Sequence, residues 1–192
     1  MSPRHVLDFW FLPAGSAGHG DQRAEWFRKD DAFDAAIAHS FGALIDQAVA
    51  GGLREWDQQG PRSVLARILL LDQFTRNARR GTPASFAGDP QALAAARELV
   101  DSGAHAQLTN VERMFAYLPF EHAEDAAMQE RSVELFSALA AADPAFAGVL
   151  DYASRHRAVI RRFGRFPHRN AILKRASTLA EVGYLAQPGS GF

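Results

Sequence analysis

The stretch Ser63–Arg80, with the sequence SVLARILLLDQFTRNARR, decides the fold. It is apolar nearly all round its middle, which is the pattern of a helix buried at the centre of a helical protein. Pro61 suits the first turn of this helix, and Gly81 suits its end. The stretch therefore predicts one long central helix that other helices surround.

The other segments also carry helical signals. From Asp30 to Gly51, apolar residues recur at spacings of three and four, which predicts an amphipathic helix of about five or six turns. Residues 120–142, after Pro119, predict a second long helix, and Gly164 predicts the end of a third. Capping residues that precede a proline or a glutamate mark further helix starts, at Ser2–Pro3, Thr82–Pro83, Asp89–Pro90, Thr109–Glu112, Asp143–Pro144 and Thr178–Glu181.

These signals predict an all-α fold of about nine helices, arranged as antiparallel helical hairpins. No segment of the sequence alternates in the manner of a strand. The arrangement is expected to be an irregular α-solenoid or a compact bundle, because no fixed repeat is visible. With 192 residues, the chain is expected to form one domain, residues 1–192.

Composition excludes several classes of function. The net charge of −1 disfavours a general polyanion binder, so nucleic acid is not an expected partner. The absence of cysteine excludes disulfides, thiol nucleophiles and thiolate zinc sites. The apolar run near the N-terminus is short and contains Asp8, so neither a signal peptide nor a membrane span is expected. The expected location is the cytoplasm.

Three predicted helices carry ionisable groups on their inward faces. Asp72 and Arg76 share the apolar face of the central helix. Glu121 and Asp125 lie on the apolar face of residues 120–142, and His156 lies in the middle of the apolar face of the helix that ends before Gly164. Because burying charge is costly unless the charge is paired, these groups are expected to meet.

Two interpretations of this cluster are open. It is either an ion-pair network that locks helices in register or a polar pocket that binds a small anionic molecule. In the second case the ligand-binding residues are Asp72, Gln73, Arg76, Asn77, Glu121, His122, Asp125, Arg165, His168 and Arg169.

The segment RRFGRFPHRN, residues 161–170, supplies the cationic part of the cluster. Pro167 predicts a helix start, where free N–H donors favour an anion, and Arg165, His168 and Arg169 surround it. Alternatively, the two arginines pair with carboxylates such as Asp72 or Glu121. If the pocket is catalytic, the candidates are His122, His168 and Asp125, with a histidine as the proton carrier.

No metal or cofactor is expected. His122 and Asp125 have a spacing that can hold a metal, but the two Glu-x-x-His units that a dinuclear site needs are absent from the sequence. The phenylalanines of residues 161–170 follow core spacing, so stacking on nucleic-acid bases is not expected. A function from another class is a scaffold that binds a peptide or a protein partner in a groove between helices.

The chain resembles a bacterial family known as domain of unknown function 924 over nearly its whole length. The motifs that carry the resemblance are VLDFWF, WFRKDDAFD, LLLDQFTRNARRGT, YLPFEHAEDAAMQE, and RFGRFPHRNAIL followed by ST. The family usually has proline where Thr75 stands and apolar residues near Ala78 and Arg79, so this sequence departs at that end of the central helix. The resemblance implies an all-helical fold like that of tetratricopeptide-repeat (TPR) proteins, and it implies no activity.

Overall fold

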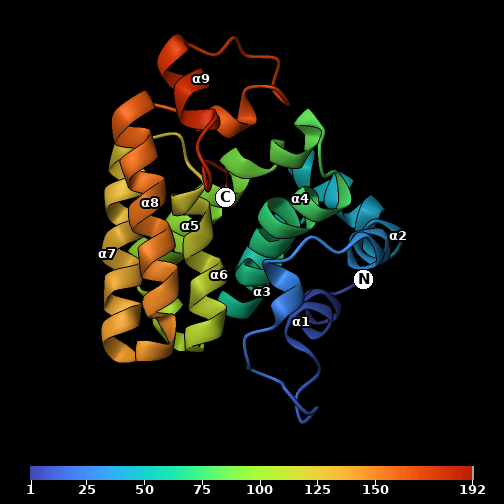
Figure 1. The fold of residues 1–192 in the computed structure, drawn as a ribbon. Helices are drawn as coiled ribbons and strands as arrows, with labels where there is room; N and C mark the ends of the chain where they lie inside the picture. The colour runs from blue at the N-terminus through green and yellow to red at the C-terminus, as the bar shows by residue number, and fades with distance from the viewer. Residues whose placement is uncertain (192) are drawn as a thin grey trace. The chain divides into compact units, whose positions relative to one another are not determined.

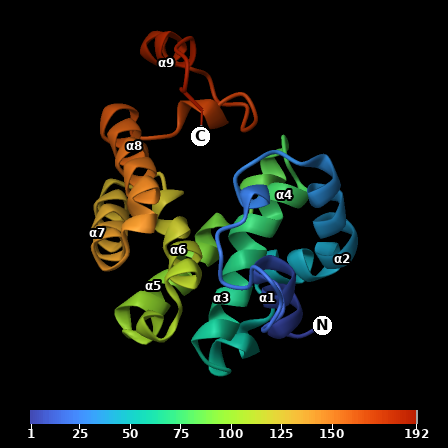
Figure 2. The same cartoon turned by 60° about the horizontal axis from the view of Figure 1, so that its bottom comes forward.

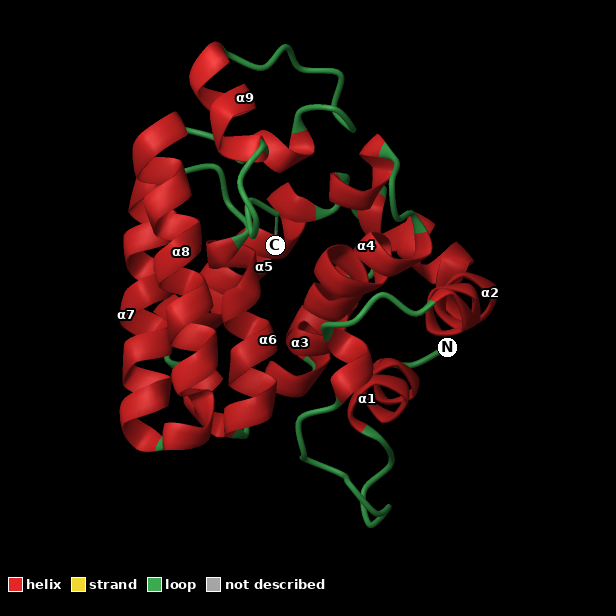
Figure 3. Ribbon diagram, in the orientation of Figure 1, coloured by secondary structure: helices red, strands yellow, loops and turns green. Residues whose placement is uncertain are grey.

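The computed structural model describes residues 1–191, and this part of the chain is all-helical, without a β-strand (Figure 3). The predicted all-α class is confirmed. The α-helices, labelled in Figure 1, are α1 (Pro3–Phe11), α2 (Asp31–Val49), α3 (Pro61–Leu69), α4 (Thr75–Ala78), α5 (Asp89–Asp101), α6 (Asn110–Glu121), α7 (Ala126–Ala142), α8 (Ala147–Phe163) and α9 (Leu179–Leu185). No helix in this described part is both long enough and apolar enough to cross a membrane.

The chain divides into two compact units. Unit 1 contains Met1–Arg80 and Ala84–Pro119, and unit 2 contains Gly81–Pro83 and the residues from Phe120 onward. The boundary at Pro119 falls inside α6, so the last turn of that helix belongs to unit 2. The single domain expected from the sequence stays a prediction.

The core of unit 1 is rich in aromatic side chains. Helix α3 packs against α1 and α5, and α1 lies beside α3 in both Figure 1 and Figure 2. Trp10 of α1 is fully buried, and its ring stacks on Trp26 with 5.8 Å between the ring centroids. Phe115 of α6 meets Trp26 edge-on at 4.8 Å. Such large apolar areas supply most of the stabilisation that a unit of this size needs.

The predicted central helix is interrupted by a wider turn. Its α-helical part α3 ends at Leu69, a π-helical turn spans Leu70–Phe74, and α4 continues from Thr75. The backbone N–H of Thr75 donates to the carbonyl of Leu70, and the Thr75 hydroxyl donates to the same oxygen at 2.7 Å. The prediction of one regular helix was therefore wrong at this turn, because apolar patterning does not distinguish an α-turn from a π-turn.

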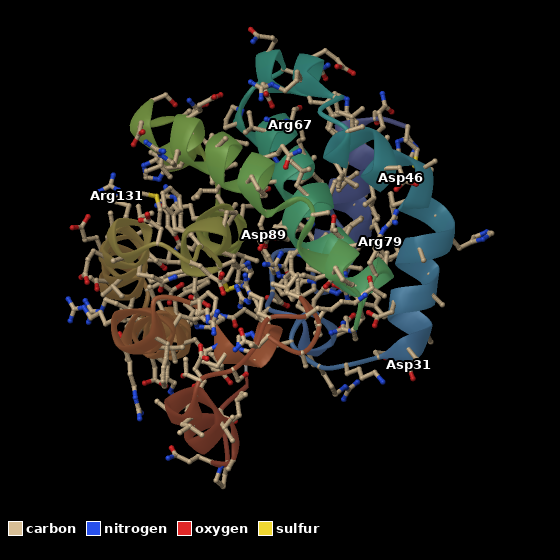
Figure 4. The ribbon with its side chains drawn as sticks, turned by 90° about the horizontal axis from the view of Figure 1, so that it is seen from above. Asp31, Asp46, Arg67, Arg79, Asp89 and Arg131 are labelled. Atoms are coloured by element: carbon tan, nitrogen blue, oxygen red, sulfur yellow. The ribbon has the colours of Figure 1, made fainter. Side chains whose placement is uncertain are left out.

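Helix α5 starts differently from the sequence prediction. The N-cap is Gly88 rather than Asp89, and no side chain caps the helix. The Asp89 carboxylate instead accepts two hydrogen bonds from Arg76, at 2.8 and 3.0 Å. Figure 4 labels Asp89 among the side chains of unit 1. A side chain that satisfies a half-buried arginine is not available for the backbone, so the pairing decides which residue caps the helix.

An ion pair also joins α4 to α2 on the surface of unit 1. Arg79 donates to the carboxylate of Asp46, and Figure 4 labels both residues. Deeper in the unit, the fully buried Arg67 makes a bidentate pair with Asp57 at 2.7 and 2.8 Å. Both pairs fix segments that are distant in sequence, as structural ion pairs do.

Unit 2 is built on the helices α7 and α8, which lie side by side in Figures 1 and 3. Phe136 of α7 and Ala153 of α8 are fully buried, and Ile160 is buried on the same face of α8 about two turns further along. The apolar face predicted for α8 is present, with His156 buried within it. Phe163, at the end of that face, is half-buried and packs against Tyr184 of α9.

Residues 120–142 do not form the single helix that the sequence predicts. Helix α6 continues through Pro119 to Glu121, and α7 begins only at Ala126. Asp125 is the N-cap of α7, because its carboxylate accepts from the backbone N–H of Met128 at 2.9 Å. The prediction was wrong because a capping aspartate starts a new helix, whereas a proline can be tolerated within one.

Helix α9 is attached to the end of α8 by a charged contact. Arg165 donates to both carboxylate oxygens of Glu181, at 2.6 and 2.8 Å, and to the carbonyl of Ala176 at 2.8 Å. Glu181 also accepts from the backbone N–H of Thr178, which completes the predicted capping box. These contacts lower the pKa of Glu181 to about 2, chiefly through the hydrogen bond from Arg165.

We expect Glu181→Gln to loosen α9, because the amide keeps the shape of the carboxylate but loses its charge. Hydrogen exchange of the α9 amides should become roughly tenfold faster or more, while exchange in α7 stays unchanged. Glu134→Gln is the matched control, since Glu134 pairs with Arg131 on the exposed side of α7. Equal exchange of α9 in both variants would contradict this role of Glu181.

Candidate functional site

In unit 1, three of the candidate residues belong to one ion-pair network. Arg76 lies between two carboxylates: its Nη1 is 2.9 Å from Asp72 Oδ1 and 2.8 Å from Asp89 Oδ1. Gln73 donates to the other oxygen of Asp72 at 2.6 Å. Burial opposes the charge of Arg76, but the two carboxylates raise its pKa above the ordinary value. This ion-pair network holds the π-helical turn against the start of α5.

The fourth candidate of unit 1, Asn77, has a separate partner. Its side-chain amide donates to Asp34 of α2 at 2.7 Å. Arg80 makes a bidentate contact with the same carboxylate, at 2.6 and 3.0 Å. Asn77 and Arg80 therefore connect the segment of α4 to α2, and their contacts stabilise the fold of unit 1.

In unit 2, two candidates hold the ends of helices. Asp125 caps α7, and Arg165 holds Glu181 of α9. Arg165 therefore makes its ion pair with Glu181, and not with Asp72 or Glu121, the carboxylates named as possible partners from the sequence. Asp125 and Arg165 therefore stabilise the termini of helices.

The helix start predicted at Pro167 is a short 3-10 turn, Pro167–Arg169. The backbone N–H just before it, of Phe166, donates to Glu124 Oε1 at 2.7 Å. Arg175 makes a bidentate contact with the same carboxylate, at 2.6 and 2.9 Å. The donors at this turn therefore bind a carboxylate of the protein itself. Hydrogen bonds of this kind are strong because the acceptor is charged.

The remaining candidates of unit 2 gather around one buried ring. The ring of Phe166 is fully buried. Its centroid lies 5.4 Å from the ring of His156, 5.6 Å from that of His168 and 4.5 Å from the guanidinium carbon of Arg169. His122 adds a further imidazole, 6.4 Å from His156. We call this group the Phe166 cluster; it comprises Glu121, His122, His156, Phe166, His168 and Arg169.

His156 is held in one tautomer by its neighbours. Its Nδ1 is 2.9 Å from the carbonyl oxygen of Tyr152, which can only accept, so Nδ1 carries the hydrogen. Glu121 Oε1 lies 3.3 Å from the same nitrogen. Both His156 and Glu121 are buried, with exposed fractions of 5% and 4%. A carboxylate beside one nitrogen of a buried imidazole is an arrangement that orients the ring.

His156 and His168 of the Phe166 cluster are neutral at physiological pH. Burial lowers the pKa of His156 to about 3 against the opposing hydrogen bond to Tyr152, and the nearby His122, His168 and Arg169 add smaller effects in the same direction. Burial also lowers the pKa of His168 to about 4, with Arg169 as the next contribution, whereas Glu124 opposes the shift. Removal of the two rings from water is therefore the main reason that they stay neutral.

The described residues contain no group of three histidine, aspartate or glutamate side chains placed to hold a metal ion. Sequence reasoning missed two features of this site: the central position of Phe166, for which the sequence predicts only core spacing, and the ion pair of Arg175 with Glu124 beside the cluster. Both features depend on how the segment after Gly164 folds back, which no spacing rule in the sequence signals.

A family model described as bacterial protein of unknown function (DUF924) matches residues 6–189. The chain belongs to this family. A solved structure of a protein of unknown function from Agrobacterium tumefaciens is similar, with a TM-score of 0.82 and 38% sequence identity over 96% of each chain. No curated protein matches the chain.

The resemblance to the DUF924 family predicts proline where Thr75 stands, directly after the π-helical turn, and proline has no N–H to donate. Thr75 is fully buried and donates both its N–H and its hydroxyl to the carbonyl of Leu70. A proline at this position could make neither hydrogen bond.

Proposed function

We propose that this protein binds a small anionic ligand at the Phe166 cluster. The observation that supports the proposal is the gathering of Arg169, His156 and His168 around the ring of Phe166. A bound anion would offset the charge of Arg169.

Specific members would have different tasks in this proposal. His122 and His168 are half-buried and would contact the ligand from the solvent side, and Arg169 would bind its charge. If the ligand is also a substrate, His122 or His168 would carry the proton and Arg169 would stabilise the developing charge. We further propose that the protein acts in the cytoplasm, which suits a chain without cysteine.

A thermal-shift screen of phosphate, sulfate, citrate and nucleoside monophosphates would test the proposal. At about a hundredfold excess over Kd, a ligand that binds only the folded state should raise Tm by about 5 °C or more. Arg169→Ala should abolish the shift and Arg169→Lys should reduce it. Arg131→Ala, on the exposed side of α7, should retain it.

Circular dichroism of each variant would separate loss of binding from loss of folding. His168→Ala provides a second variant of the site if Arg169→Ala unfolds. A screen in which no anion stabilises the wild type, or in which both site variants respond like Arg131→Ala, would contradict the proposal.

A peptide-binding, TPR-like scaffold is the alternative proposal, and one observation favours it. Leu179 and Val182 lie one turn apart on α9, with exposed fractions of 92% and 54%. Apolar side chains at that spacing form a small contact surface. If the protein binds a peptide on this surface, Leu179→Glu should abolish peptide binding. Anion binding at the Phe166 cluster should be retained in the same variant.

A further inference from the structure

The Phe166 cluster contains titratable groups from four separate segments of unit 2. Helix α6 contributes Glu121, and α8 contributes His156, which lie 3.3 Å apart. The cluster's other charged or titratable side chains are His122 from the connection between α6 and α7, and His168 and Arg169 from the turn Pro167–Arg169. Two further charged residues lie beside the cluster: Glu124 from the same connection and Arg175 from the segment after the turn.

We propose that anion binding at the Phe166 cluster is coupled to proton uptake by His168 and His156, so that the site responds to both anion concentration and pH. This inference rests on the proposed function and concerns the regulation of the same site. It follows from the placement of two imidazoles and the arginine that would hold the anion around one shared ring, each within 6 Å of its centroid.

The physical argument is one of charge balance. Arg169 disfavours a proton on either histidine; at His168, Glu124 opposes this effect, and His122 and Arg175 add to it. An anion beside Arg169 supplies the opposite charge, and charges that are shielded from bulk water interact strongly at such distances. The pKa of each histidine must therefore rise when the anion binds. By thermodynamic linkage, lowering the pH must tighten anion binding.

The proton balance assigns different tasks to the two histidines. His168 is half-buried, so its proton can come directly from solvent. His156 already carries a hydrogen on Nδ1, which it donates to Tyr152, so an added proton goes to Nε2. The resulting imidazolium would have Glu121 beside it, 3.3 Å from Nδ1.

Isothermal titration calorimetry with sulfate would test the coupling, because sulfate keeps its charge over the pH range of interest. We expect Kd to be roughly fivefold lower at pH 5.5 than at pH 7.5. Titrations in two buffers with different ionisation enthalpies should reveal net proton uptake at pH 5.5. His168→Gln should remove most of the pH dependence, and His39→Gln, on the exposed surface of α2, should retain it.

The outcomes separate this inference from the proposed function. Sulfate binding with the same Kd at both pH values, and without proton uptake, would overturn the coupling and leave the anion site intact. No binding to the wild type at either pH would overturn both. A pH dependence that persists in both His168→Gln and Arg169→Ala would place the bound sulfate elsewhere and would also overturn the inference.

Discussion

Gly88→Ala should lower the free energy of unfolding by about 3 kcal/mol or more. The backbone of Gly88 lies directly against the π-helical turn of unit 1. A methyl group added at this position would overlap the carbonyl oxygen of Leu71 and lie 2.8 Å from its carbonyl carbon. Both obstacles are backbone atoms, so no side chain can rotate to make room.

The loss of stability in Gly88→Ala comes from the steric overlap and not from the backbone conformation of residue 88. Gly88 has φ −88° and ψ −11°, which any residue can adopt. Relief of the overlap requires α5 to move away from the π-helical turn, and this movement would also strain the contact between Arg76 and Asp89. The cost therefore includes both repacking and a weakened ion pair.

Urea unfolding of Gly88→Ala and of Gly42→Ala would test this explanation. Gly42 lies within α2, and a methyl group there would meet no atom within 4 Å. Because alanine is the better helix former, Gly42→Ala should stabilise the protein by about 0.5–1 kcal/mol. Similar stabilities for the two variants would show that the close approach at Gly88 has no energetic consequence.

Lowering the pH from 8 to 5 should destabilise the protein by about 2 kcal/mol for His156 and a similar amount for His168. In the folded state their pKa values are about 3 and about 4, whereas the ordinary value for the unfolded chain is 6.5. Between these values the unfolded chain binds more protons than the folded protein. The stabilisation that the two neutral histidines contribute is therefore fully present above about pH 7, and it is lost progressively as the pH falls through 6.5 toward 3.

Urea unfolding at pH 8, 7, 6 and 5 would measure the decline before most carboxylates titrate. His156→Gln should be less stable than the wild type at pH 8, but its stability should change less between pH 8 and pH 5. His39→Gln should follow the wild type, because His39 is exposed. A wild-type free energy of unfolding that is constant from pH 8 to pH 5 would disprove the neutral, buried state of both histidines.

The sequence predicted those parts of the fold that depend on local signals. The helix that begins after Asp30, the glycine end of α8 and the capping box at Thr178 are present as predicted. Each of them needs only neighbouring residues, whose side-chain donors and acceptors satisfy the free backbone groups at a helix end. The motifs in the sequence were also sufficient to identify the family, since the family model matches residues 6–189.

Two errors in helix boundaries have different causes. A proline at position 119 predicts a helix boundary, but the helix continues through it to Glu121, and the local cap at Asp125 starts the next one. At Asp89 the sequence predicts a cap, but the carboxylate binds Arg76. This tertiary contact competes with a local preference of similar energy, and the local pattern does not reveal which one prevails.

By itself, the sequence determined the all-helical class, most helix ends and the burial of Asp72, Glu121 and His156, although Asp125, expected on the same inward face as Glu121, is exposed. It could not assign partners to these groups, because an arginine on an inward face can reach any carboxylate that the folded chain brings near. Only the tertiary structure decided that Arg165 binds Glu181, that Arg175 binds Glu124, and that His156 meets Glu121. Helical periodicity specifies the direction of a side chain from its own axis, whereas pairing depends on how separate helices pack.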